Sequence, residues 1–235
     1  MVHDLAPHVK IAAVLSFVLV VVSTPIKQWQ SFLLFFLLVL LTSTAAKIPL
    51  GLLVKRSLIE IPFVFFAILM PFFGHGETVT IGAITLYQAG LVAGLSIVTK
   101  GTLGVLVAVI ISTTTTAREI LRGLEKLKLP AIMVQIASFM LRYINVISDE
   151  MERMKIARES RGFVATGIKH WRVIATSAAA LFIRSYERGE RVHLAMLSRG
   201  FRGSLPHTET RKVGAKMWLT ALSLPGFALI SSLAF

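Results

Sequence analysis

Residues 11–24 have the sequence IAAVLSFVLVVVST, which contains no charged side chain. Such a run is typical of a membrane helix, although a full span needs about 17–25 residues, so flanking residues must lie in the interface. A cleaved signal peptide is the alternative interpretation of this segment. It is disfavoured because Asp4 and Lys10 give a mixed charge before the run and no A-x-A cleavage site follows it.

Four more apolar segments follow, and we expect membrane helices at residues 31–46, 58–73, about 84–112 and 213–235. The long fourth segment contains Lys100 and Gly101, which could mark a tight turn between two half-length spans. We expect one continuous helix instead, because a turn would move the following basic block across the membrane. Lys100 then needs a polar partner, either in a helix-packing ion pair or as a charge on a coupling or substrate pathway.

The composition supports a membrane protein. Of the 235 residues, 55% are hydrophobic and 16% are charged, whereas a soluble domain is about 45–50% apolar and roughly 25% charged. The chain contains no cysteine. A disulfide framework, a thiolate nucleophile and a Cys-ligated zinc site are therefore excluded.

The charges are concentrated in one part of the chain. Residues 117–216 contain 19 Lys and Arg against 9 Asp and Glu, and the rest of the chain contains 6 against 3. We therefore divide the chain into four N-terminal spans (residues 1–116), a basic block (117–212) and a C-terminal span (213–235). The sequence predicts an all-α membrane protein with about five transmembrane helices and a cytoplasmic block of amphipathic helices.

The cations also predict the orientation in the membrane. The loop with Lys47, Lys55 and Arg56 is basic, whereas the loop at residues 74–77 contains no lysine or arginine. Because short basic loops stay in the cytoplasm, the N-terminus and the basic block should be cytoplasmic and the C-terminus outside. We expect a multi-pass protein of the inner (plasma) membrane.

The basic block is predicted to contain three helices. A short one at residues 118–127 ends before Leu129-Pro130, because proline disfavours helical backbone at the residue before it. In the two longer ones, near residues 133–154 and 169–199, apolar side chains recur every three or four residues, as on one face of a helix. These stripes are Met133, Ile136, Met140, Ile144, Ile147, Met151 and Met154, and Trp171, Ile174, Ala178, Leu181, Ser185, Val192 and Met196.

The two long helices end in the same motif, A-x-x-S-R-G-F, at residues 157–163 and 195–201. Glycine just past a helix end and arginine in the last turn are explained by ordinary capping. The repeated alanine, serine and phenylalanine are not, and two equal tips suggest two equivalent partner sites. The dipeptide Arg122-Gly123 shares only the arginine and glycine, and we assign it to capping.

Several nucleotide- and metal-binding motifs are absent from the sequence. It has no G-x-x-x-x-G-K-[ST] phosphate loop, no G-x-G-x-x-G after a strand and no H-E-x-x-H zinc site. The histidines are scattered, and His3 and His8, which flank Asp4, are better explained as interfacial polar residues than as metal ligands. Any energy source must therefore come from another subunit.

Nearly the whole chain resembles the CbiQ/EcfT family, the transmembrane T components of energy-coupling factor transporters. The resemblance rests on the paired tips, on residues 118–124 (REILRGL) after a run of threonines, on Leu129-Pro130 and on Ile61-Pro62-Phe63. The N-terminal DLAPH at residues 4–8, Lys10 and Ser23-Thr24-Pro25 resemble the cobalt/nickel branch. A T component for a vitamin such as biotin, or a shared T component, is the alternative.

The resemblance implies a coupling subunit that is not an enzyme. Its partners would be two ABC-type ATPases that bind ATP and Mg²⁺, a separate substrate-binding membrane subunit, and the lipid bilayer, with no cofactor on this chain. Arg161 and Arg199 would enter grooves on the ATPases. The implied ATPase-coupling residues are Ala157, Ser160, Arg161, Gly162, Ala195, Ser198, Arg199 and Gly200. The implied substrate-subunit interface comprises Met133, Met140, Ile144, Ile147, Met151, Ala178 and Leu181.

Two other classes of function fit the sequence less well. The basic block could bind nucleic acid, but it lacks a recognition motif, and sorting of cations to the cytoplasmic side explains its charge more simply, so we expect no nucleic-acid partner. An intramembrane enzyme would need His and Asp or Glu side chains close together. Asp4, Glu60 and His75 are too dispersed in the sequence to form an obvious site.

Overall fold

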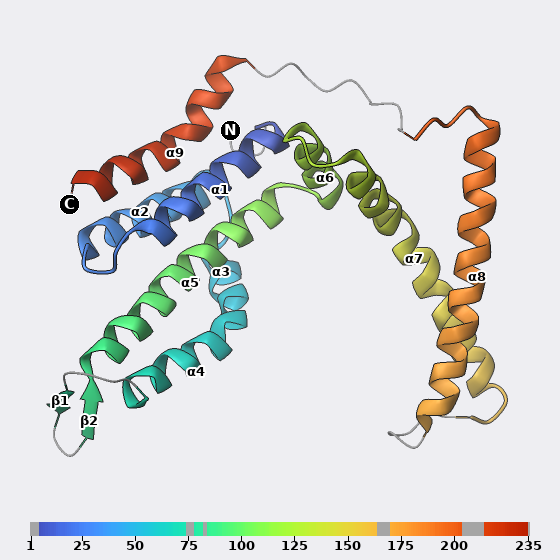
Figure 1. The fold of residues 1–235 in the computed structure, drawn as a ribbon, viewed down its shortest axis with the longest axis horizontal. Coiled ribbons are helices and arrows are strands. Elements are labelled where there is room, and N and C mark those ends of the chain that lie inside the picture. Colours follow the sequence, from blue (N-terminus) through green and yellow to red (C-terminus); the bar gives the residue numbers. More distant parts are fainter. Residues whose placement is uncertain (1–4, 74–77, 82–83, 164–169, 204–213, 235) are drawn as a thin grey trace. The chain divides into compact units, whose positions relative to one another are not determined.

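The computed structural model describes residues 5–73, 78–81, 84–163, 170–203 and 214–234. Their regular secondary structure is helical apart from one β-hairpin, which confirms the predicted all-α class (Figure 1). The α-helices are α1 (Pro7–Ser23), α2 (Trp29–Ala45), α3 (Leu50–Ser57), α4 (Ile61–Leu69), α5 (Gln88–Thr114), α6 (Ala117–Lys126), α7 (Ala131–Glu159), α8 (Trp171–Ser198) and α9 (Ala215–Ala234). The 3₁₀ turns η1 (Leu58–Glu60) and η2 (Met70–Phe72) flank α4, and strands β1 (Thr78–Ile81) and β2 (Ile84–Tyr87) pair antiparallel.

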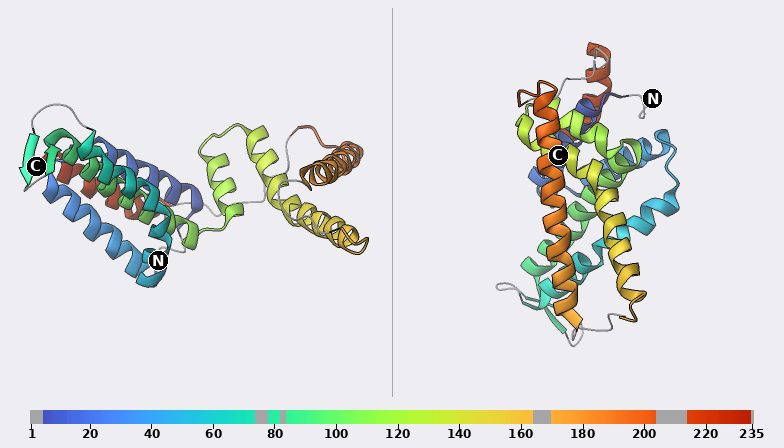
Figure 2. Two further views of the ribbon diagram at one scale, coloured as in Figure 1. Left: turned by 90° about the horizontal axis from the view of Figure 1, so that it is seen from below. Right: turned by 90° about the vertical axis from the view of Figure 1, so that its right-hand side faces the viewer.

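The core of the N-terminal region is formed by α1, α2, α5 and α9, and α1 contacts both α5 and α9 (Figure 2). Phe17, Phe35 and Leu103 are completely or almost completely buried there. The rings of Phe17 and Phe35 meet edge to face with their centres 5.9 Å apart. Because the outer faces of these helices expose leucine, valine and phenylalanine, the helices are apolar on all sides, as expected for helices surrounded by lipid.

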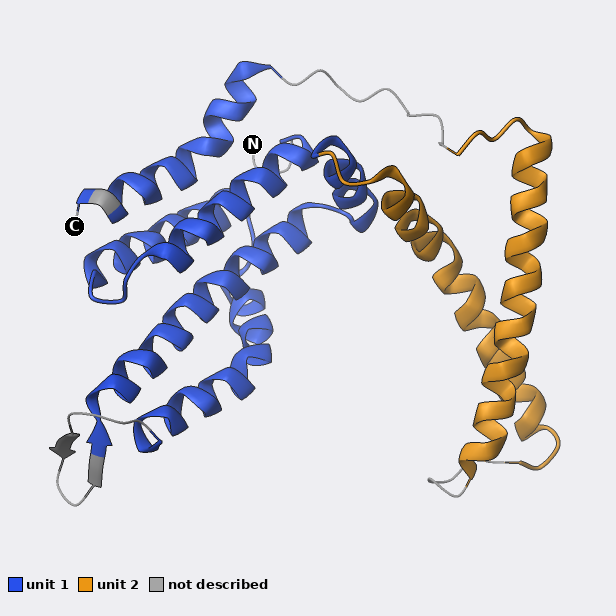
Figure 3. Ribbon diagram, in the orientation of Figure 1, with its two compact units in different colours: residues 1–127, 211–235 blue, residues 128–210 orange. Residues whose placement is uncertain are grey.

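Contacts divide the chain into two compact units (Figure 3). The first comprises Met1–Leu127 and Arg211–Phe235, and the second comprises Lys128–Thr210. The first unit thus includes α6, which our sequence-based division placed in the basic block. The reason is packing, because α6 contacts α1.

Helix α6 begins with a capping box but does not end where we expected. The Glu119 amide donates to the Thr116 hydroxyl, and the Thr116 amide donates to the Glu119 carboxylate at 2.8 Å, which lowers the pKa of that carboxyl. The assignment of Arg122-Gly123 to a cap was wrong, since the helix continues to Lys126. Gly123 is buried against α1, where a Cβ would lie 2.7 Å from Ile11 Cδ1, so close helix packing explains this glycine.

Helix α5 is continuous through Lys100, which confirms one long helix instead of a turn. Lys100 Nζ donates to the Val22 carbonyl at 2.7 Å, near the end of α1. The lysine thus has the expected polar partner, but this partner is a backbone carbonyl and not the anion of an ion pair. The helix begins only at Gln88, because residues 84–87 form β2.

Helix α5 closely approaches η2 through Gly90 and α4 through Gly94, two glycines spaced four residues apart. A Cβ on Gly90 would collide with the Met70 carbonyl oxygen, and one on Gly94 would lie 2.5 Å from the Ala67 carbonyl oxygen. Small residues at this spacing let membrane helices pack backbone against backbone. Helix α4 itself has nine residues, because 3₁₀ turns interrupt the third predicted span on both sides.

Two described helices, α5 and α7, are long and apolar enough by length and composition to cross a membrane, and α1 and α2 are shorter apolar helices. Helix α7 lies in the segment that we expect on the cytoplasmic side. Its acidic residues, Asp149, Glu150, Glu152 and Glu159, all lie in its second half. The five-span topology stays a prediction.

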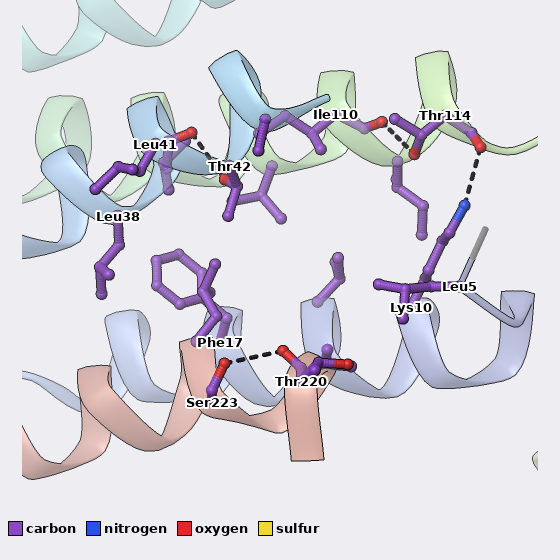
Figure 4. A pocket seen from close by; sticks show the side chains of 18 of the residues that line it. Leu5, Lys10, Phe17, Leu38, Leu41, Thr42, Ile110, Thr114, Thr220 and Ser223 are labelled. Carbon is purple, nitrogen blue, oxygen red and sulfur yellow. Dashed lines mark hydrogen bonds between the residues drawn. The ribbon is translucent and has the colours of Figure 1, made fainter. Parts of the chain in front are cut away.

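A cavity of about 430 Å³ lies within the first unit, between α1, α2, α5 and α9 (Figure 4). Its walls are mostly aliphatic and aromatic. The cavity is partly open to its surroundings, so a molecule outside the protein can enter it.

Candidate coupling site at the helix tips

The second unit is built on an antiparallel pair, α7 and α8. Glu150 in α7 accepts a hydrogen bond from Arg184 in α8 at 2.6 Å. Further along α7, Arg158 donates to the Ser177 hydroxyl at 2.5 Å. Residue numbers rise along α7 while those of the partners fall along α8, so the helices run in opposite directions.

We call the α7–α8 pair the helical hairpin, or simply the hairpin below. The two repeated motifs consequently lie at its opposite ends. The motif that ends α7 is next to the start of α8, whereas the motif that ends α8 is next to the start of α7. The Gln135 side chain near the start of α7 donates to the Gly203 carbonyl just past the second motif, at 2.9 Å. Helix α8 has 28 residues, so at 1.5 Å per residue the tips are separated by about 40 Å.

The first tip is a Schellman motif. Gly162 has a φ of +73°, in the left-handed region that favours glycine. Its amide donates to the Glu159 carbonyl at 2.9 Å, and the Phe163 amide donates to the Arg158 carbonyl at 3.1 Å. The ring of Phe163 meets that of His170 edge to face at 5.3 Å.

The second tip has the same geometry. Gly200 has a φ of +83°. Its amide donates to the Leu197 carbonyl at 2.9 Å, and the Phe201 amide donates to the Met196 carbonyl at 3.0 Å. The prediction that both glycines cap helices is therefore confirmed, and the repeat in sequence is also a repeat in backbone geometry.

The guanidinium groups of the tips differ from those that hold the hairpin. Arg158 and Arg184 have partners within the second unit. Arg161 and Arg199 are exposed, and neither side chain makes a hydrogen bond or ion pair with the described part of the chain. Each presents five donors in a fixed fork that suits a carboxylate or a set of carbonyls.

The alanines and serines of the two motifs are also exposed. The Ser160 hydroxyl donates to the Ile156 carbonyl and the Ser198 hydroxyl to the Ala195 carbonyl, each at 2.9 Å. Ala157 and Ala195 lie one turn before these serines. Each tip therefore has two small side chains, an alanine and a serine, on the helix turn beside its arginine.

The apolar stripe of α7 is exposed instead of packed against α8. Met140 is 67% exposed and Ile144 is 59% exposed, and Met133, Ile147 and Met151 are exposed as well. On α8, Ala178 is exposed and Leu181 is half-buried. A row of exposed methionine and isoleucine side chains marks a surface that is covered by a partner or by lipid.

Two exposed aromatic residues of α8 were absent from the stripe predicted for this helix. Phe182 is 71% exposed and Tyr186 is 68% exposed on α8, one and two turns after Ala178. Their spacing of four residues, continuing from Ala178, was the available signal. Leu181 and Ser185, which we had chosen instead, are half-buried.

No group of three or more histidine, cysteine, aspartate or glutamate side chains that could hold a metal ion occurs among the described residues. His3 and Asp4 lie outside them. His8 lies against Trp218 of α9, with ring centres 5.9 Å apart. Burial, together with the charge of Lys126, lowers the pKa of His8.

Known proteins match this chain over most of its length. A family model described as "CbiQ: Cobalt transport protein" matches residues 1–210. The energy-coupling factor transporter transmembrane protein EcfT of Listeria innocua is 28% identical over 99% of this chain and 92% of its own length. EcfT of Bacillus subtilis is 29% identical over 91% of this chain and 85% of its own. The cobalt transport protein CbiQ of Rhodobacter capsulatus is 28% identical over 46% of this chain and 45% of its own.

These matches confirm two expectations from the sequence, that the protein resides in a membrane and that it is a transporter subunit and not an enzyme. The family model covers far more than half of the chain. The chain therefore belongs to the CbiQ cobalt transport protein family, and it is similar over nearly its full length to the transmembrane proteins of energy-coupling factor transporters.

Proposed function

We propose that this transmembrane T component couples two ATPase subunits to a separate substrate-binding membrane subunit. One observation carries the proposal: two helix tips with the same A-x-x-S-R-G-F motif and the same backbone geometry lie at opposite ends of the α7–α8 pair, and neither tip arginine bonds to the described part of the chain through its side chain. Two equivalent tips about 40 Å apart suit two equivalent binding sites, one on each member of a pair of ATPases.

Arginine suits this task because of its geometry. A guanidinium that enters a groove can bind a carboxylate with two parallel hydrogen bonds, which lysine cannot do. The exposed alanine and serine beside each arginine leave room for the groove wall. Arg161 and Arg199, with Ala157, Ser160, Gly162, Ala195, Ser198 and Gly200, are the proposed coupling residues.

The hairpin would transmit motion from one end to the other. The contacts Glu150–Arg184 and Arg158–Ser177 hold α7 and α8 together. When ATP draws the ATPases together, the two tips move with them and the pair of helices rocks as a body. No covalent step occurs on this chain, and ATP and Mg²⁺ are bound by the ATPases.

The exposed stripe is the proposed contact with the substrate-binding subunit. Methionine is flexible and polarisable, so Met133, Met140 and Met151 suit a surface that must repack as the complex moves. Ile144, Ile147, Ala178 and Leu181 would belong to the same surface. Phe182 and Tyr186 extend it along α8.

For the substrate, we propose cobalt or nickel. The N-terminal segment supports this proposal through its resemblance to the cobalt/nickel branch, and the CbiQ relative from Rhodobacter capsulatus is named as a cobalt transport protein. A T component for a vitamin, or one shared by several substrate-binding subunits, is the second candidate. It is favoured by the longer matches to EcfT proteins, which cover about nine-tenths of this chain or more.

The proposed location is the inner (plasma) membrane, with the N-terminus and the tips in the cytoplasm. The experiment that tests the function is purification of the tagged chain from its native cells in mild detergent, followed by identification of the proteins that accompany it. Two ATPase subunits and a small membrane protein are expected, and the metal or vitamin bound by that membrane protein identifies the substrate. Recovery of the chain alone, from membranes that contain the ATPases, would refute the proposal.

A further inference from the structure

The cavity of the first unit has a polar end and an apolar end. The polar end lies where α1 begins and α5 finishes, near Lys10 and Thr114, and the apolar part extends past Phe17 to Leu38 and Leu41 (Figure 4). At about 430 Å³ its volume is in the range of small-molecule sites, roughly 300–1,000 Å³. A volume with one polar end and one apolar end suits an amphiphile.

Lys10 provides the charge at the polar end. Its ammonium group is buried, and it donates to the Thr114 carbonyl at 3.1 Å and to the Thr115 hydroxyl at 3.4 Å. The hydroxyls of Thr42 and Thr220 donate to carbonyls of their own helices, so they can only accept a further hydrogen bond. An ammonium group is the donor that recognises an anionic oxygen such as that of a phosphate.

The apolar part of the cavity is poorly suited to hold water. A buried water needs two to four polar partners, and near Phe17 and Leu41 the lining hydroxyls of Thr42 and Ser223 already donate to backbone carbonyls. The cavity is partly open, so apolar molecules that surround the helices can reach these walls. In a membrane, the hydrocarbon that is available everywhere to fill it is a lipid acyl chain.

We propose that this cavity binds one anionic phospholipid, with an acyl chain between α1, α2, α5 and α9 and the phosphate at Lys10. The neighbouring helix α6 contacts α1 and carries one net positive charge, from Arg118, Arg122 and Lys126 against Glu119 and Glu125. This charge has the sign that an anionic headgroup requires. The lipid would come from the leaflet at the α1 N-terminal end, which the proposed orientation makes the cytoplasmic leaflet.

Native mass spectrometry of the detergent-purified full chain tests this proposal. After delipidation, the chain is titrated with phosphatidylglycerol and with phosphatidylcholine of the same acyl chains. We expect one phosphatidylglycerol per chain, bound about tenfold more tightly than phosphatidylcholine. Lys10→Gln should weaken phosphatidylglycerol binding more than phosphatidylcholine binding and thereby remove most of that preference.

A pair of variants tests the location of the acyl chain. Ala13 lines the cavity, so Ala13→Phe should fill it and weaken lipid binding at least tenfold. Leu15 is 54% exposed on the same helix and does not line the cavity, so Leu15→Phe should bind lipid as the unchanged protein does. If Ala13→Phe does not fold, the two lipids and Lys10→Gln still decide the question.

Three results would overturn the proposal: no lipid on the unchanged chain, equal binding in Ala13→Phe, or lipid on the isolated chain but none on its complex with partner subunits. The last result would mean that a partner's helix fills the cavity. Because none of the three variants alters the tips, co-purification of the ATPases reports separately on the proposed coupling function.

Discussion

Replacing the tip arginines by alanine distinguishes a capping role from a coupling role, because the two roles predict free-energy losses of different size. An exposed arginine in the last turn stabilises its helix through the dipole by about 0.3–1 kcal/mol. Arg161 and Arg199 make no other side-chain interaction within the described part of the chain, so loss of either costs the isolated hairpin no more than that. A desolvated anchor in an ATPase groove would instead contribute about 2–4 kcal/mol, or roughly 30- to 900-fold in affinity at that site.

The assay is ATPase co-purification together with substrate uptake, at matched expression of the chain. Each single alanine variant should weaken coupling, and Arg161→Ala with Arg199→Ala should detach the ATPases. Arg→Lys should rescue poorly, because the fork geometry is lost. Arg191 is a matched control, since it is exposed on α8 and lies 3.9 Å from Glu187 in a weak pair, so Arg191→Ala should have little effect. Full co-purification and uptake in the double alanine variant would refute the coupling role.

Three further predictions follow from the hairpin and the topology. Gly162→Ala should destabilise the end of α7 by about 1 kcal/mol, measured by thermal unfolding, because alanine is disfavoured at a φ of +73°. Met140→Glu combined with Ile144→Glu should block recovery of the substrate-binding subunit with the chain, because assembly would bury two carboxylates without partners. A cysteine at His75, which lies outside the described residues, should react with an impermeant reagent in intact cells, whereas one at His170 should react only after permeabilisation.

Each of these predictions has its own control and its own contrary outcome. Gly189 lies inside α8 in open space without a positive φ, so Gly189→Ala should preserve or raise stability, and an equal loss in both glycine variants would remove the capping argument. Asn145 is already polar and exposed, so Asn145→Glu should assemble normally. Normal assembly of the Met140 and Ile144 double variant would instead assign the stripe to solvent. Labelling at His170 in intact cells would reverse the proposed orientation.

The sequence predicted most helices because apolar runs and periodic stripes are local signals. The bounds of α7 and α8 differ from the expected ones by a few residues, and both glycine caps were identified from the residues around them. The same local reasoning failed at Gly123. That glycine sits inside α6, and it is needed because α1 passes close by, which no local pattern reveals.

The other discrepancies also have causes outside the local sequence. The third predicted span is broken by η1 and η2, although its composition is apolar apart from Glu60. The four-residue spacing of Gly90 and Gly94 could have indicated close packing of α5, but not the helix that it meets. The partner of Lys100 is a backbone carbonyl at the end of α1, which only the three-dimensional fold brings near.

The scarcity of buried residues in the second unit indicates that it depends on its surroundings. Val134 is the one fully buried hydrophobic residue among its described residues, although α7 and α8 together contain 57 residues. Helices in proteins obtain most of their stability from packing of an apolar face, and here those faces are exposed. The two polar contacts between α7 and α8 fix how the helices pair but cannot replace a core. If partner subunits cover the stripes as proposed, they also stabilise α7 and α8, and assembly of the transporter is then linked to the ordering of these helices.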